Sequence, residues 1–258
     1  MRILLIRHGD PDYEHDTLTE KGRREAALLA KAAPYMHIDH CFVSPLGRAR
    51  DTAAPSLRAI GKEAAVCDWL TEFPAKTNLN TSKELIAAYP DAQKDDGTYA
   101  PRNVIWDMLP SYWAEHPEYM DLNGWKHSDA ARSGDAVQVY AHVCSRLDRL
   151  LETYGYMRKG ALYQVTRENT ETIAFYCHFG IICALLSHLW NVSPFVLWHG
   201  IALAPSSVTE IVSEERQKGT ASFRALRVGD ISHLYAGEEP PSFAARFCEV
   251  FSNTQQRH

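Results

Sequence analysis

The chain of 258 residues is long enough for one α/β domain with an insertion. Its apolar fraction of 45% and its charged fraction of 23% are typical of a globular protein and argue against extensive disorder. The net charge of -5 disfavours broad binding to nucleic acid or to an anionic membrane, although a local cluster of arginines could still bind phosphate. No apolar run approaches the roughly 20 residues that a membrane span requires.

The six cysteines form no C-x-x-C pair, and several of them lie in apolar runs. A free cysteine in such a run behaves as a small apolar residue. We therefore expect reduced thiols in the core of a cytoplasmic protein, and no disulfide framework. The N-terminal residues contain no long apolar segment, so we expect no cleaved signal peptide.

The first predicted strand, Ile3–Ile6, stops abruptly at Arg7, His8 and Gly9. Open α/β sheets bind ligands at the carboxyl ends of such strands. Arg7 offers a planar set of N–H donors suited to phosphate, and His8 can be an uncharged nucleophile near pH 7. Taken alone, the tripeptide is also compatible with a plain strand end and turn.

A polar loop over residues 10–16 precedes a predicted helix that ends at Pro34. Thr19 is a suitable N-cap for this helix, and Glu20 complements the positive end of the helix dipole. Apolar residues then recur at helical spacing and give the helix one apolar face.

The next predicted strand, Cys41–Ser44, is broken by Pro45, and a helix is expected over about residues 47–60. Arg48 lies near the N-terminus of this helix, where backbone N–H groups favour an anion. Arg50 is two residues further along and cannot share that face of the helix. We therefore assign Arg48 to phosphate and Arg50 to the surface or to a structural ion pair.

Residues 64–70 are expected to form another strand, with Glu72 just after its end. The segment from 74 to about 132 then changes character, because prolines and tryptophans alternate with charges and give no regular core periodicity. We expect an inserted lid of short helices there, since long connections in compact domains are usually functional. A plain surface excursion is the alternative. The tryptophans could bind an apolar or ring-containing leaving group, although we favour them as the lid's own core.

The clearest predicted helix is Asp135–Tyr154, which Ser133 or Asp135 could cap. A buried strand over 172–177 follows and leads directly to His178, before a helix over 179–190. Two later strands alternate in polarity and are expected to pair at the edge of the sheet, over residues 207–212 and 223–228. Strands that alternate with helices predict an α/β fold with a mainly parallel central sheet and helices on both faces.

Four blocks of this sequence together resemble the histidine phosphatase superfamily (branch 1), whose best-known members are the cofactor-dependent phosphoglycerate mutases. The blocks are Arg7-His8-Gly9, Ser44-Pro45-Leu46-Gly47-Arg48, Trp69-Leu70-Thr71-Glu72 and Tyr176-Cys177-His178. Their order and spacing match the family across the core of the chain, but not over residues 74 to about 132. The resemblance implies a phosphoglycerate mutase-like α/β domain over residues 1–258, with a lid inserted at about 74–132.

The resemblance also implies a role for each of these side chains. His8 would be the nucleophile and become a phosphohistidine, while Arg7, Arg48 and His178 would bind the phosphoryl oxygens. Glu72 would protonate the departing oxygen and later activate water. We expect a small phosphorylated substrate, no cofactor and no metal; the oligomeric state cannot be predicted from one sequence.

Three other functions stay open at this point. A metal hydrolase is conceivable with 12 histidines, but no H-E-x-x-H or comparable ligand motif occurs. A mutase would carry a Ser-x-Trp-Asn type segment after the Arg-His-Gly block, whereas this chain has Asp10-Pro11-Asp12-Tyr13-Glu14, whose carboxylates would repel a bisphosphate if they faced it. A non-catalytic phosphate-binding protein is the third alternative. Because all the expected catalytic residues are present, we favour a phosphomonoester phosphatase.

Overall fold

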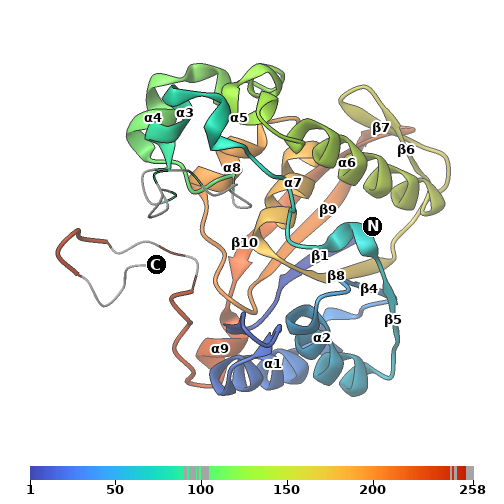
Figure 1. Cartoon of the computed structure of the whole chain (residues 1–258). Coiled ribbons are helices and arrows are strands. Elements are labelled where there is room, and N and C mark those ends of the chain that lie inside the picture. The colour runs from blue at the N-terminus through green and yellow to red at the C-terminus, as the bar shows by residue number, and fades with distance from the viewer. Residues whose placement is uncertain are drawn as a thin grey trace.

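A central sheet organises the computed structural model, with the strand order β5-β4-β8-β1-β9-β10-β7-β6 (Figure 1). The structure describes residues 1–89, 92, 97, 99, 105–244, 246 and 249–253. The strands of this sheet are β1 (Arg2–Arg7), β4 (His40–Val43), β5 (Ala64–Val66), β6 (Tyr156–Lys159), β7 (Leu162–Val165), β8 (Thr172–Cys177), β9 (Val208–Gln217) and β10 (Thr220–Asp230). A separate short ladder pairs β2 (Pro11–Asp12) with β3 (Thr17–Leu18).

Helices alternate with these strands and also fill the insertion. The α-helices are α1 (Glu20–Ala32), α2 (Gly47–Ile60), α3 (Lys83–Ala88), α4 (Pro110–Glu115), α5 (Asp129–Arg132), α6 (Ala136–Thr153), α7 (Phe179–Trp190), α8 (Pro194–Gly200) and α9 (Ser232–Ala236). The 3-10 turns are η1 (Ala33–Met36), η2 (Asp68–Leu70), η3 (Leu79–Thr81), η5 (Pro117–Tyr119) and η6 (Gly124–His127). Among the described residues, no helix is both long and apolar enough to cross a membrane.

The predicted fold class is confirmed, with one half of the sheet parallel and the other antiparallel. β5, β4, β8 and β1 pair in parallel, whereas β9 pairs antiparallel with both β1 and β10, and the β7–β6 hairpin extends that half. β7 and β9 run opposite to the other six strands. The antiparallel part is therefore larger than the expected edge, because the β6–β7 hairpin was not predicted.

The two faces of β1 are buried in two separate apolar clusters, as a central strand requires. Ile3 and Leu5 join the larger cluster with residues of α6 and α7. Leu4 and Ile6 join a smaller cluster with residues of α1 and α2. Figure 1 shows α1 and α2 on one side of the sheet and α6 and α7 on the other. This burial holds the end of β1, and with it residues 7 and 8, in a fixed place.

Several predicted boundaries differ from the structure. The expected strand over 64–70 ends at Val66 and gives way to η2, so Glu72 follows a 3-10 turn. Thr19 caps α1 as predicted, since its hydroxyl accepts the N–H of Gly22 at 3.0 Å. Asp135 occupies the N-cap position of α6 without capping it, because its carboxylate accepts the N–H of Lys76 instead.

The segment from 74 to about 132 contains short helices, and its buried apolar side chains belong to the larger apolar cluster on one face of the sheet. Trp125 is fully buried there and packs against Tyr140 and Phe195. Pro90 and Pro101 of this segment lie outside the described residues. Cys41, Cys67, Cys144, Cys177 and Cys183 are free, while Cys248 also lies outside the described part of the chain.

The loop after β1 lies so close to α1 that two glycines meet there. A Cβ on Gly22 would lie 2.2 Å from the carbonyl oxygen of Asp10, and one on Gly9 would lie 2.8 Å from the carbonyl oxygen of Gly22. No side chain can enter this contact without moving the backbone. The close approach explains a glycine in the first turn of α1, where its conformational freedom is otherwise a disadvantage.

Gly22→Ala should destabilise the protein, although a glycine-to-alanine change inside a helix normally stabilises it by about 1 kcal/mol. The new methyl group would push residues 9 and 10 away from α1. Urea unfolding measures the effect. As a comparison, Ala27→Gly, at an exposed position of the same helix, should lower the free energy of unfolding by about 1 kcal/mol, because glycine has a lower helix propensity than alanine. A more stable Gly22→Ala protein would show that this contact has been misread.

Candidate active site

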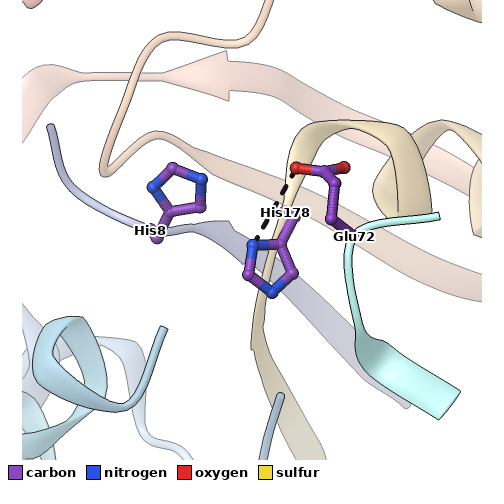
Figure 2. A group of neighbouring side chains, drawn as sticks. All are labelled: His8, Glu72 and His178. Carbon is purple, nitrogen blue, oxygen red and sulfur yellow. Dashed lines mark ion pairs between the residues drawn. The ribbon is translucent and has the colours of Figure 1, made fainter. Parts of the chain in front are cut away.

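Two histidines lie side by side at the carboxyl edge of the parallel half of the sheet. His8 follows β1 and His178 follows β8, and these strands are paired so that Arg7 is opposite Cys177. The imidazole centroids are 5.2 Å apart, and both side chains are fully buried. Figure 2 shows the rings next to each other, with the carboxylate of Glu72 near both.

The side chain of His8 has one nitrogen occupied and one free. Nδ1 lies 2.7 Å from the carbonyl oxygen of Gly9, so this nitrogen carries the proton and donates it. Nε2 is buried and has no hydrogen-bond partner among the described residues. The backbone is fixed as well, because the His8 N–H donates to Cys177 and its carbonyl oxygen accepts from Ser206. The result is an uncharged imidazole with a free lone pair in a rigid position.

Both imidazoles are kept neutral by their surroundings. Burial, followed by the charge of Arg7, lowers the pKa of His8 well below 6.5, despite the opposing effect of the hydrogen bond to Gly9. Burial, followed by the neighbouring His8, lowers the pKa of His178 well below 6.5. Arg48 acts on both rings in the same direction.

A buried serine determines how His178 faces the site. Ser44 Oγ lies 2.7 Å from His178 Nε2 and also accepts the N–H of Leu46 at 3.3 Å. We assign the serine proton to Nε2 and the proton of His178 to Nδ1, because Nδ1 faces the carboxylate of Glu72. This Nδ1 is buried, lies 3.9 Å from Glu72 Oε2 and is unpartnered among the described residues. His178 thus presents an N–H donor toward His8 and Glu72.

Glu72 is held at the start of α7. Its Oε1 accepts the N–H of Gly180 at 2.7 Å, which leaves Oε2 as the oxygen nearer to His178. The side chain keeps 27% of its surface exposed, so water can reach it. Burial raises the pKa of Glu72 above 4.5, whereas the charges of Arg7 and Arg48 oppose this change. A carboxyl group in this setting can hold a proton and release it near the histidines.

The two predicted phosphate-binding arginines also reach this site. Arg7 is 1% exposed and donates from Nη1 to the carbonyl oxygen of Leu203, while its Nε has no partner among the described residues. Arg48 lies in the first turn of α2, and its Nε is likewise unpartnered there. Both guanidinium groups therefore keep an N–H donor available for an oxyanion.

One carboxylate already binds near the N-terminus of α2. Asp16 accepts the N–H of Gly47 and Nη1 of Arg48, each at 2.6 Å. The predicted attraction of this helix end for an anion is thus partly met by the protein itself. Arg50 is exposed, in agreement with its predicted place on the surface.

The acidic residues of the loop after Gly9 are mostly turned to local partners. Asp10 accepts the hydroxyl groups of Thr19 and Ser242. Asp12 accepts backbone N–H groups of residues 14 and 15, and Glu14 is exposed. The expected repulsion of a bisphosphate by these three carboxylates therefore has little support, and Asp16 is the carboxylate that contacts a predicted phosphate ligand.

A metal ion is a second possible occupant of the same space. His8, Glu72 and His178 each offer one ligand atom, and these atoms lie within 4.8 Å of one another. Within the described ranges, no other such group of histidine, cysteine and carboxylate side chains occurs. The adjacent guanidinium groups of Arg7 and Arg48 repel a cation and attract an anion. The charges around the site thus favour a phosphoryl group.

The structure brings together all five predicted site residues, but sequence reasoning gave no role to three others that contact them. Ser44 stood within a quoted block, yet nothing indicated its bond to His178. Asp16 and Tyr13 lie in a loop without periodicity, and Tyr13 has its ring 5.4 Å from the Arg48 guanidinium. Such contacts join residues more than 30 positions apart, so only the folded chain reveals them.

Comparisons with known proteins give a family and several similar folds. Residues 3–105 match the family model of the histidine phosphatase superfamily (branch 1). A probable phosphatase from Schizosaccharomyces pombe is 26% identical over 252 residues, which cover 92% of this chain and 97% of the relative. These findings confirm the resemblance that the four sequence blocks indicated.

Three phosphatases are among the solved structures with a similar fold. A mycobacterial glucosyl-3-phosphoglycerate phosphatase with inorganic phosphate is 20% identical, with a TM-score of 0.57 over 90% of this chain and 98% of that one. A phosphoserine phosphatase from Entamoeba histolytica is 17% identical, with a TM-score of 0.55 over 90% and 98%. The α-ribazole phosphatase from Shigella flexneri is 20% identical, with a TM-score of 0.52 over 89% and 97%. At these identities the likeness concerns the fold.

Ser44→Ala should lower kcat/KM for a phosphomonoester about tenfold, because His178 loses the hydroxyl that fixes its orientation and proton position. Ser56→Ala is the matched control, since Ser56 is another fully buried serine, in α2. Steady-state kinetics and urea unfolding should be measured on both variants. Unchanged kinetics in Ser44→Ala, at equal stability, would contradict this role.

Proposed function

We propose that this chain, with residues 3–105 matching the histidine phosphatase superfamily, is a metal-independent phosphatase of the histidine acid phosphatase type. Its substrate is a small phosphomonoester, and its intermediate is a phosphohistidine on His8. The arrangement of His8 supports this most directly, because Nδ1 is tied to Gly9 and Nε2 is left neutral, buried and unpartnered among the described residues. The phosphatases among its relatives support the same class of reaction.

In the first step, Nε2 of His8 attacks phosphorus and the bond from phosphorus to the ester oxygen breaks. The departing oxygen takes the proton from Glu72, whose raised pKa suits it to hold that proton. Arg7, Arg48 and the Nδ1–H of His178 bind the phosphoryl oxygens and stabilise their charge as the transition state forms.

In the second step, water attacks the phosphorus of the phosphohistidine. The carboxylate of Glu72 takes a proton from that water, and the bond between phosphorus and His8 breaks. Inorganic phosphate leaves, while His8 is neutral again and Glu72 is again protonated. Each group thus returns to its starting state, and the scheme requires no metal or cofactor.

We propose that the insertion at about 74–132 acts as a lid on the leaving-group side. Trp106 lies against Gly180, since a Cβ on this glycine would be 2.3 Å from the indole and 2.8 Å from Glu72. The indole is thus next to the proposed proton donor. A cytoplasmic location is part of the same proposal, and the free cysteines among the described residues support it.

Hydrolysis of an aryl phosphate should persist in excess chelator and fall by more than about 10³-fold in His8→Ala, because the variant lacks the nucleophile. His142→Ala, which changes an exposed histidine of α6, is the matched control and should keep wild-type activity. Quenching the wild type with alkaline detergent in the presence of ³²P-labelled substrate should trap label on the protein, because a phosphohistidine is stable in base and labile in acid, and His8→Ala should trap none.

Three outcomes would contradict this proposal. Turnover that is lost to chelator and kept in His8→Ala would indicate a metal hydrolase. Interconversion of 2- and 3-phosphoglycerate faster than hydrolysis of any ester would indicate a mutase. Phosphate binding without turnover of any ester in a broad panel would indicate a binding protein.

The dependence of kcat/KM on pH should be bell-shaped. Activity should rise with pH as His8 loses its proton, at a pKa well below 6.5, and fall as Glu72 loses its proton, at a pKa above 4.5. In Glu72→Gln the falling limb should disappear. The kcat/KM of this variant should fall about 10²–10⁴-fold with an alkyl phosphate. It should fall less with p-nitrophenyl phosphate, because that leaving group needs no proton. Equal losses with both esters would contradict the role of Glu72.

A further inference from the structure

Tyr13 lies in the loop of a short hairpin, with its ring near the Arg48 guanidinium. The hairpin is formed by β2 and β3, in which Pro11 pairs with Leu18 and Asp12 with Thr17. Asp12 accepts the backbone N–H groups of residues 14 and 15, which closes the turn just after Tyr13. The backbone around Tyr13 is therefore held from within the hairpin.

The far side of the hairpin is anchored on α2. Asp16 accepts the N–H of Gly47 and Nη1 of Arg48, each at 2.6 Å. The hydroxyl group of Thr17 donates a hydrogen bond to the carboxylate of Asp51 and accepts one from Nη2 of Arg23 at 3.0 Å. These contacts place the hairpin beside Arg48, so the position of Tyr13 relative to the site is defined by the fold.

Tyr13 contacts both arginines of the site at once. The guanidinium carbon of Arg48 lies over its ring, 5.4 Å from the centroid. Its phenol also interacts electrostatically with Arg7, which is only 1% exposed, because each of the two groups shifts the pKa of the other. Although 57% of the surface of Tyr13 is exposed, its hydroxyl end must therefore point inward. Tyr13 thus reaches both phosphate-binding cations from the solvent side.

The phenol has a hydrogen-bond donor to offer in this position. Arg7 can only donate, so it interacts with a lone pair of the phenol oxygen and leaves the O–H hydrogen free. Burial raises the pKa of Tyr13, while the charge of Arg7 opposes this effect, and the hydroxyl therefore stays protonated at neutral pH. Two acceptors face this hydroxyl, namely the carboxylate of Glu72, whose charge also acts on the pKa of Tyr13, and an oxyanion bound between Arg7 and Arg48.

We propose that Tyr13 is a substrate-contacting residue, which donates its hydroxyl hydrogen bond to a phosphoryl oxygen and covers the solvent side of the phosphoryl pocket with its ring. This inference rests on the proposed function, in that it takes the ligand between the arginines to be a phosphoryl group. It adds a donor to the set formed by Arg7, Arg48 and His178. It also assigns the hairpin of β2 and β3 to substrate binding.

Tyr13→Phe tests the hydroxyl alone, because the ring over Arg48 is kept. Removing one donor to a charged oxygen should lower kcat/KM about tenfold and weaken inhibition by inorganic phosphate to a similar extent. Tyr13→Leu, which also removes the ring, should lower kcat/KM further and weaken inhibition by inorganic phosphate further. Tyr35→Phe, at an 82% exposed tyrosine of η1, is the matched control and should match the wild type in both measurements.

Direct phosphate binding, measured by isothermal titration calorimetry, separates this inference from the proposed function. Weaker phosphate binding by Tyr13→Phe supports the contact, even if the wild type hydrolyses no ester, in which case only the proposed function fails. Equal phosphate affinity and equal kcat/KM in Tyr13→Phe and an active wild type overturn the contact and leave the phosphatase intact. A change in kcat/KM with unchanged phosphate affinity also overturns it, because a phosphoryl contact must act on both.

Discussion

The hydrogen bond from His8 Nδ1 to the carbonyl oxygen of Gly9 is the interaction on which the rest of the site depends. It leaves Nε2 as the ring nitrogen without a partner among the described residues. It forms only while the backbone of residues 8–10 keeps its present conformation. Thr52 accepts the N–H of Gly9 at 2.9 Å, and Glu25 accepts the N–H of Asp10 at 2.7 Å. Burial raises the pKa of Glu25 to about 7, so the protein tolerates a costly carboxyl group in order to hold this loop.

The charged groups of the site and its neutral imidazoles belong to different side chains. Arg7 and Arg48 supply positive charge, while His8 and His178 are kept neutral, so one can act as a nucleophile and the other as a directed donor. Such a division suits a dianionic ligand, since cationic imidazoles would bind it and then have no lone pair for attack. Asp16 offsets part of the charge of Arg48 without using all of its donors.

The parts of this molecule that sequence could predict are those with local patterns. Apolar runs predicted β1 and β8, and the abrupt change to Arg7, His8 and His178 marked their ends. The β6–β7 hairpin was missed because its two strands are only four residues each, and because the exposed Met157 and Leu162 break the alternation of apolar and polar residues. Residues 68–70 were expected to extend a strand because Trp69 and Leu70 are apolar, but they are buried in a 3-10 turn. The orientation of each site residue depends on contacts between distant segments, which no local pattern contains.

The pairing of β1 with β8 has a consequence for how the chain is made. Arg2 pairs with Thr172, so the apolar strand β1 is synthesised roughly 170 residues before its parallel partner, and its antiparallel partner β9 comes later still. Until then both of its edges are unpaired and its face toward α6 and α7 is uncovered, and such surfaces favour aggregation during synthesis. Contacts of this sequence separation also slow folding. β1, which leads to His8, therefore stays unpaired for most of the synthesis of the chain, and we expect nascent chains to depend on chaperones over that interval.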